Sequence, residues 1–207
     1  MLRLFSIALI ALAEATAARD KFTLLDVDSS EWPENMQDST GYTNAKWYKN
    51  HTELQFNYMN GSSVEVTKSM PSLASLTSNR YSNFSAGPFY LALSYEVLGG
   101  APVYEDEWAA FLQIHTHSRG TIQWVESGTG TQLGENKQRV WSLDGEQVDD
   151  IAFIRLTLWG NDAENWAGFY GPIFRNIELS LITGNLEATL TNRIEDFKPG
   201  WNVAVRE

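Results

Sequence analysis

The chain consists of short apolar, strand-forming runs separated by turn residues, a pattern typical of an all-β protein. Residues 53–59 alternate polar and apolar side chains, as expected for a strand with one buried face. Residues 108–116 also fit a helical spacing, but the turn at 118–120 and the β run after it favour a strand. The other predicted strands are 22–27, 64–67, 89–97, 121–125, 139–143, 151–159 and 173–182, with weaker ones at 186–190 and 202–205.

Turn residues predict how these strands are joined. Asn60-Gly61 is a favoured hairpin dipeptide and predicts a hairpin between 53–59 and 64–67. Gly99-Gly100 and Asp144-Gly145 are predicted to end strands, and strands do not alternate with helices as in a parallel sheet. The predicted fold class is therefore all-β, an antiparallel β-sandwich or jelly roll. Segments 28–45, 68–88 and 127–137 are predicted to be loops, and 191–197 fits a helical turn.

Composition narrows the class of protein. A chain of 207 residues can bury a substantial core in one domain. It has no cysteine, which excludes disulfides, thiolate metal sites and a cysteine nucleophile. Its formal charge of −11 argues against nucleic-acid binding, which requires basic patches. A 13% share of aromatic residues argues against a disordered acidic chain.

The N-terminus predicts secretion. Residues 1–17 combine Arg3, an apolar run from Leu4 to Ala13 and an Ala15-Thr16-Ala17 cleavage site, which together predict a signal peptide. A β-sandwich domain at 18–183 and a C-terminal extension or closing strands at 184–207 are expected to follow. No second apolar run is long enough for a membrane span. The predicted location is extracellular, and the sequons at Asn50, Asn60 and Asn83 predict N-glycosylation.

Two short motifs are candidates for metal binding. His115-Thr116-His117 could place two imidazoles on one strand face, as in the cupin motif, but the following carboxylate and downstream histidine are not in step. Because Leu112 and Ile114 occupy the opposite face, the histidine pair is expected to face solvent. The acidic run Glu105-Asp106-Glu107 lacks a calcium-loop pattern and fits a solvated loop better. No phosphate loop or nucleophile elbow is present, so the sequence predicts neither an enzyme nor a cofactor.

Tryptophan residues are the remaining chemical feature. Trp108, Trp124 and Trp159 lie within strand patterns and are expected to be buried or half-buried. Trp166 lies in a predicted loop with glycine on its far side, so it is the better candidate for an exposed platform.

One stretch resembles a known family. A strand at 151–158 runs into a loop with the spacing G-x-D-x-x-x-W-x-G-x-x-G, and a second strand follows. This resembles the F-box-associated (FBA) domain, the sugar-recognition module of certain F-box proteins. The clear resemblance covers 139–182, and it implies a galactose-binding-like β-sandwich. The motif positions are Gly160, Asp162, Trp166, Gly168 and Gly171, with Asn176 also in step.

The resemblance implies a sugar site around the motif tryptophan, where aromatic residues stack on N-acetylglucosamine. Asp162, Gly168 and Gly171 are expected to shape the loop. This chain departs from the glycan-binding members at three positions: Asn165 replaces an aromatic residue, Ala167 a lysine and Ile173 a basic residue. It also lacks a preceding F-box, so no ubiquitin-ligase role is implied. The predicted ligand-binding residues are Asn165, Trp166, Phe169 and Tyr170.

Three hypotheses follow from the sequence. The first is a secreted, non-catalytic module that binds the glycans of glycoproteins. The second is an extracellular interaction or structural domain in which Trp166 belongs to the core. The third is a metal-dependent enzyme that uses His115 and His117, and whether these histidines ever bind metal is left open.

Overall fold

The computed structural model describes residues 20–33, 36, 45–48, 53–56, 61–78, 88–100, 106–129, 134–161 and 171–183. These residues form strands and two short helices along the chain. The elements are β1 (Asp20–Asp26), β2 (Ala45–Tyr48), β3 (Glu53–Phe56), β4 (Ser62–Ser69), α1 (Leu73–Ser78), β5 (Phe89–Leu98), β6 (Glu107–Thr116), β7 (Gly120–Thr129), β8 (Glu135–Leu143), α2 (Gly145–Asp150), β9 (Ile151–Asn161) and β10 (Ile173–Thr183).

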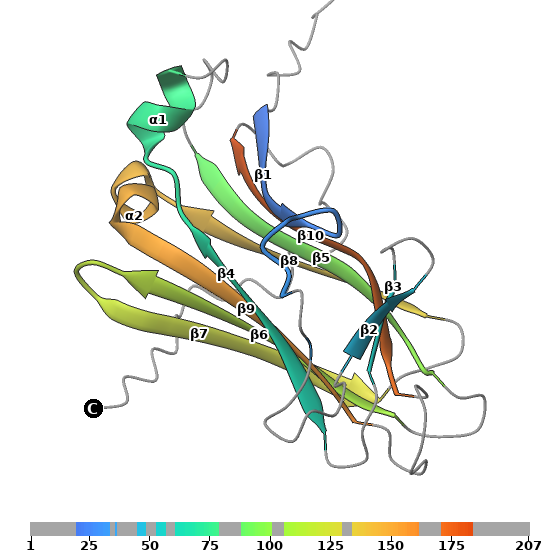
Figure 1. Ribbon diagram of the computed structural model, residues 1–207. Helices are drawn as coiled ribbons and strands as arrows, with labels where there is room; N and C mark the ends of the chain where they lie inside the picture. Colours follow the sequence, from blue (N-terminus) through green and yellow to red (C-terminus); the bar gives the residue numbers. More distant parts are fainter. Residues whose placement is uncertain are drawn as a thin grey trace, which may run out of the picture.

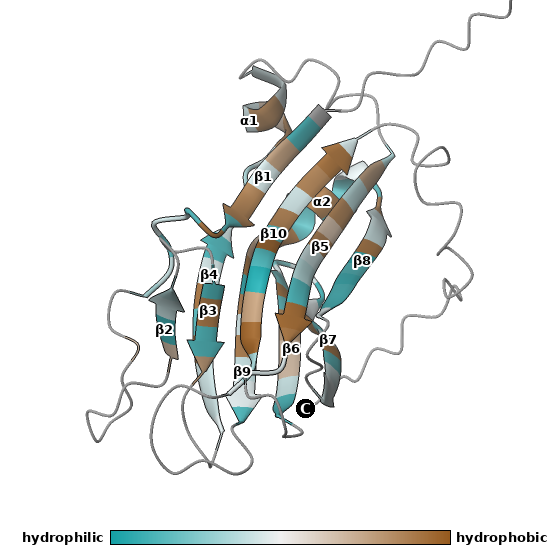
Figure 2. Ribbon diagram, turned by 90° about the vertical axis from the view of Figure 1, so that its right-hand side faces the viewer, coloured by the Kyte–Doolittle hydropathy of each residue, from teal (hydrophilic) through white to brown (hydrophobic). Residues whose placement is uncertain are grey.

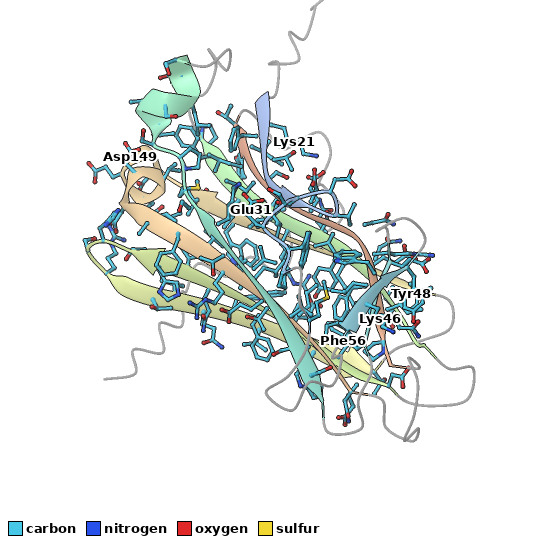
Figure 3. All side chains as sticks on the ribbon, viewed as in Figure 1. Lys21, Glu31, Lys46, Tyr48, Phe56 and Asp149 are labelled. Carbon is cyan, nitrogen blue, oxygen red and sulfur yellow. The ribbon has the colours of Figure 1, made fainter. Side chains whose placement is uncertain are left out.

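The strands form two antiparallel sheets that pack as layers (Figure 1). The six-stranded sheet has the order β2-β3-β10-β5-β8, and β1 also pairs with β10. The four-stranded sheet has the order β4-β9-β6-β7. The predicted antiparallel β-sandwich is therefore confirmed. Lys46 and Tyr48 lie near Phe56 at one end of the molecule, which we call the Phe56 end, whereas Asp149 on α2 lies at the other, the α2 end (Figure 3).

The core lies between the two sheets because alternate side chains of each strand point inward. In β4 buried and exposed positions alternate from Ser62 to Thr67, and β9 alternates over most of its length. Apolar and polar bands also alternate along β10 and β5 of the six-stranded sheet (Figure 2). Phe174 is fully buried at the centre of the aromatic contacts, with ring centroids 5.7 Å from Phe56, 5.9 Å from Tyr95 and 6.3 Å from Trp108.

The predicted hairpin at Asn60-Gly61 is wrong. Strand β3 pairs with β2 and β10, whereas β4 pairs with β9 in the other sheet. The chain therefore crosses between the sheets here. Gly61 does have the positive φ of 77° expected of a turn glycine, but local alternation and turn chemistry do not specify which strand becomes the neighbour.

Several boundaries also differ from the prediction. Helix α1 lies within the predicted loop 68–88, strand β2 was not predicted, and β7 and β8 extend into both ends of the predicted loop 127–137.

Asp144 follows the last residue of β8, as predicted, but it is also the N-cap of α2. Its side chain accepts a hydrogen bond from the Gln147 N–H at 2.7 Å, and the Gln147 side chain accepts one from the Asp144 N–H at 2.9 Å. This capping box identifies a helix start that the turn interpretation missed.

Several predictions lie outside the described residues. They are the signal peptide at 1–17, the sequons at Asn50, Asn60 and Asn83, the weak strands at 186–190 and 202–205, and the helical turn at 191–197. None of the helices that the structure describes is long and apolar enough to cross a membrane.

Candidate functional site

The predicted glycan-binding loop is described only where it joins the sandwich. Asp162, Asn165, Trp166, Gly168, Phe169 and Tyr170 lie outside the described residues. The loop leaves β9 after Asn161 and returns at Gly171, at the Phe56 end.

Gly171 lies against the backbone of β3. Its N–H donates to the Phe56 carbonyl oxygen at 3.1 Å, and the Phe56 N–H donates to the Pro172 carbonyl oxygen at 3.1 Å. A Cβ at position 171 would lie 2.9 Å from the same Phe56 oxygen. The return point of the loop therefore requires glycine because the two backbones approach closely.

The described residues build a candidate site on the outer face of the four-stranded sheet, the face turned away from the core. Strands β4, β9, β6 and β7 are in antiparallel register, so their outward side chains form rows across the sheet. One row is Ser63, Trp159, Ala109 and Ser127, and the next is Glu65, Thr157, Phe111 and Val125. The two rows after these are Thr67, Arg155, Gln113 and Gln123, and then Ser69, Phe153, His115 and Thr121.

Aromatic rings concentrate on the two central strands of this outer face. Trp159 and Phe153 project from β9, and Phe111 and His115 project from β6; all four are half-buried. We call these four residues the aromatic spine. Trp159 and Phe153 are six residues apart, which corresponds to about 20 Å along the strand.

Polar side chains surround the aromatic spine. The Gln113 amide donates to the Gln123 side-chain oxygen at 3.2 Å, and the Asn161 amide donates to the Glu107 carboxylate at 3.2 Å. Arg155 Nε lies 3.2 Å from the Glu65 carboxylate. The outer face therefore combines half-buried rings with amide, hydroxyl and carboxylate groups on all four strands.

His115 has a distinct environment within the spine. Its ring stacks on Phe153 with a centroid distance of 4.1 Å and an interplanar angle of 18°, and Thr121 Oγ1 lies 2.9 Å from Nδ1. Burial lowers the pKa of His115, the positive charge of Arg155 lowers it further, and Glu65 acts in the opposite direction. The imidazole is therefore neutral at pH 7.

His117 is exposed in the turn after β6, as expected, and His115 lies on the expected outer face opposite Leu112 and Ile114, where it is half-buried. The His117 backbone N–H donates to the Asp150 carbonyl oxygen at 2.8 Å. Among the residues that the structure describes, no group of three histidine or acidic side chains is placed to hold a metal ion.

Buried side-chain polar atoms without a hydrogen-bond partner are concentrated on the outer face. In the described part of the chain, four buried side-chain polar atoms lack a hydrogen-bond partner, and three of them belong to outer-face residues. These three atoms are His115 Nε2, Arg155 Nε and Asn161 Oδ1. Arg155 Nε is close enough to Glu65 for an ion pair, but the angles do not make a hydrogen bond. Buried polar atoms are normally paired, so this concentration distinguishes the outer face.

The amino-acid sequence indicates only part of this site. Trp159 was expected to be buried or half-buried, and it is half-buried; Trp108 is buried and Trp124 is half-buried against Trp141, with centroids 5.5 Å apart. Alternation along β9 indicates that Trp159 and Phe153 share a face. It does not indicate that β6 lies beside β9, so the spine cannot be assembled from the sequence.

No protein-family model matches the chain, and no curated protein matches it in sequence. The resemblance to the F-box-associated domain therefore stays a sequence-based prediction.

Among solved structures, the chain is similar to a family 16 carbohydrate-binding module, with 15% identity, 72% of this chain and 89% of that chain covered, and a TM-score of 0.42. It is also similar to a structure described as CBM4, with 6% identity, coverage of 70% and 84%, and a TM-score of 0.40. A family 11 carbohydrate-binding module from Clostridium thermocellum, in complex with a β-1,3-1,4-linked tetrasaccharide, gives 14% identity, coverage of 77% and 94%, and a TM-score of 0.35. Likenesses this distant say nothing about a ligand of this chain.

Proposed function

We propose that the protein is a carbohydrate-binding module that binds neutral oligosaccharides on the outer face of its four-stranded sheet. The observation that carries this proposal is the aromatic spine with polar side chains around it. Aromatic rings cover the apolar faces of sugar rings, and amides, hydroxyls and carboxylates pair with the sugar hydroxyls.

The charge of the molecule supports a neutral ligand. On the outer face Arg155 is paired with Glu65, and Glu107 accepts a hydrogen bond from Asn161. The formal charge of −11 would repel polyanionic glycans at long range.

The proposal includes the predictions made from the sequence. The module acts outside the cell, without catalysis, on glycans of glycoproteins, and the loop residues Asn165, Trp166, Phe169 and Tyr170 contribute to binding. The signal peptide and the resemblance to the F-box-associated domain support these points. The loop begins directly after Asn161, so it continues from the end of the outer face that carries Trp159.

Isothermal titration calorimetry at neutral pH tests the proposal. The probes are cellotetraose, mannotetraose, galactotetraose, chitotetraose and a released high-mannose N-glycan. We expect at least one probe to bind, and both Trp159→Ala and Phe111→Ala to reduce its affinity at least tenfold. Tyr90→Ala is the matched control, because Tyr90 is a half-buried aromatic residue on the outer side of the six-stranded sheet.

Circular dichroism and thermal melting establish that each variant is folded. Folded wild-type protein that binds none of the five probes would overturn the proposal. It would favour the alternative of an extracellular interaction or structural domain. Equal loss of affinity in Phe111→Ala and Tyr90→Ala would show that the outer face is not the site.

A further inference from the structure

His115 differs from the other rings of the aromatic spine because it can carry a proton. One side of its ring faces Phe153 at 4.1 Å, and Nδ1 lies 2.9 Å from the Thr121 hydroxyl. The other ring nitrogen, Nε2, is buried and has no hydrogen-bond partner among the described residues. The stacked position therefore provides a partner for one nitrogen only.

This position suits a neutral imidazole. In the tautomer that carries its proton on Nδ1, a neutral ring donates its one N–H to the Thr121 hydroxyl, and the bare Nε2 needs no proton acceptor. A charged ring has two N–H donors, and the donor at Nε2 would be buried without an acceptor. A buried, charged donor without an acceptor costs free energy, so protonation of His115 destabilises the conformation in which its ring stacks on Phe153.

The charged groups around His115 act in the same direction. Arg155 of β9 faces it with a positive charge that disfavours a second cation, and Arg155 outweighs the opposing effect of Glu65 on β4. From β7 the facing group is the uncharged Thr121 hydroxyl, and from β6 itself the next outward side chain is the uncharged Gln113. A protonated ring at this position would be stabilised only by leaving Phe153 and reaching water above the outer face.

The space above the outer face is where the proposed ligand lies. If the protonated His115 ring left Phe153, the aromatic spine would lose one of its four rings. The hydrated, charged imidazole would also occupy space in which a sugar ring of the proposed ligand lies. A neutral carbohydrate lying over His115 would in turn exclude the water that a charged imidazole needs.

We propose that His115 is both a ligand-contacting residue and a proton-sensitive control of this site, so that carbohydrate binds the neutral ring and protonation releases it. This inference rests on the proposed carbohydrate-binding function. Because the ligand prefers the neutral form, binding displaces a proton from any protonated His115. Affinity then falls as the pH drops through the titration of His115 in the free protein, approaching a limit of about tenfold per pH unit. By reciprocity, bound carbohydrate lowers the pKa of His115.

The experiment measures affinity by calorimetry between neutral pH and about pH 5, the range in which histidine titrates. The probe is the tetrasaccharide or N-glycan with the highest affinity at neutral pH. We expect wild-type protein to lose affinity at least fivefold across this range. His115→Gln should bind the probe more weakly, because it lacks one ring of the aromatic spine, but with a flat pH profile, because glutamine can pair with Thr121 and does not titrate. His117→Gln, two residues away in the exposed turn, should retain the wild-type profile.

A second readout follows the His115 ring protons by NMR during a pH titration, with and without the saturating probe. We expect the probe to shift the His115 midpoint to lower pH. Binding by wild-type protein with a flat pH profile, or a profile that persists in His115→Gln, would overturn this inference and leave the proposed function intact. Failure of every probe to bind at any pH would instead overturn the proposed function, and this inference with it.

Discussion

The indole of Trp159 lies against the backbone of Gly61. A Cβ at position 61 would lie 2.5 Å from Trp159 Cζ2, closer than a side chain can come without displacing the ring. Gly61 also has a φ of 77°, in the left-handed region that favours glycine. The turn into β4 therefore both requires glycine and holds one ring of the aromatic spine in place.

This contact predicts the effect of Gly61→Ala. We expect the free energy of unfolding to fall by about 2–4 kcal/mol, because the change adds backbone strain and displaces the indole. Gly120→Ala is the matched control, because Gly120 has a φ of 79° but open space around its Cβ position. Gly120→Ala should lower the free energy of unfolding by about 1–2 kcal/mol, because it adds only backbone strain. Urea unfolding measures both values, and equal losses would contradict the packing role of Gly61.

The contacts of Phe174 predict a large core effect. Phe174→Ala should lower the free energy of unfolding by about 3–5 kcal/mol, because it leaves a cavity among Phe56, Tyr95 and Trp108. Val125→Ala changes a strand residue that is 48% exposed, so it should stay within about 0.5 kcal/mol of wild type. A loss under about 1 kcal/mol for Phe174→Ala would show that the two sheets do not pack through this residue.

An ion pair on the six-stranded sheet predicts a pH dependence of stability. Arg175 donates to both carboxylate oxygens of Glu96, at 2.6 Å from Nη2 and 2.7 Å from Nε, and Glu96 is 8% exposed. These bonds lower the pKa of Glu96 below its ordinary value of 4.5. Because the pKa of Glu96 is lower in the folded protein, ionised Glu96 contributes fully to the free energy of unfolding well above pH 4.5. This contribution is lost as the pH falls below 4.5 through the folded-state pKa.

Glu96→Gln should therefore lower the melting temperature most at neutral pH, with a cost of about 1–3 kcal/mol. Its difference from wild type should shrink as the pH falls below 4.5. Glu178→Gln removes the half-buried partner of the exposed Lys21 and should cost under about 1 kcal/mol. Melting curves across this pH range check both variants, and a difference between wild type and Glu96→Gln that grows on acidification would contradict the sign.

The capping box at α2 predicts a local effect. Asp144→Ala should lower the free energy of unfolding by about 0.5–2 kcal/mol, because the Gln147 N–H loses its acceptor. Asp144→Asn should retain most of the stability, since an asparagine oxygen can accept the same bond. Urea unfolding compares the two, and similar losses would show that the cap does not stabilise the helix.

The sequence predicts the long strands of this protein better than its short helices. Alternation and strand-forming residues place the strands that became β5, β6, β9 and β10 to within a few residues, because side chains on a half-buried strand must alternate. The same reasoning missed α1 and α2, each of six residues, which are too short to show a helical period. The predicted binding residues from Asn165 to Tyr170 stay predictions.

The sequence by itself determined that this is an all-β protein and which residues of each strand share a face, because both depend on local geometry. Only the tertiary structure decided that Ser62 to Ser69 leave the sheet of β3 and pair with β9, because pairing depends on contacts between distant segments. That pairing, together with β6 beside β9, sets Trp159, Phe111, Phe153 and His115 on one face. The candidate site therefore depends on the register between β6 and β9, which makes neighbours of outer-face residues that are 38 to 54 positions apart in the sequence.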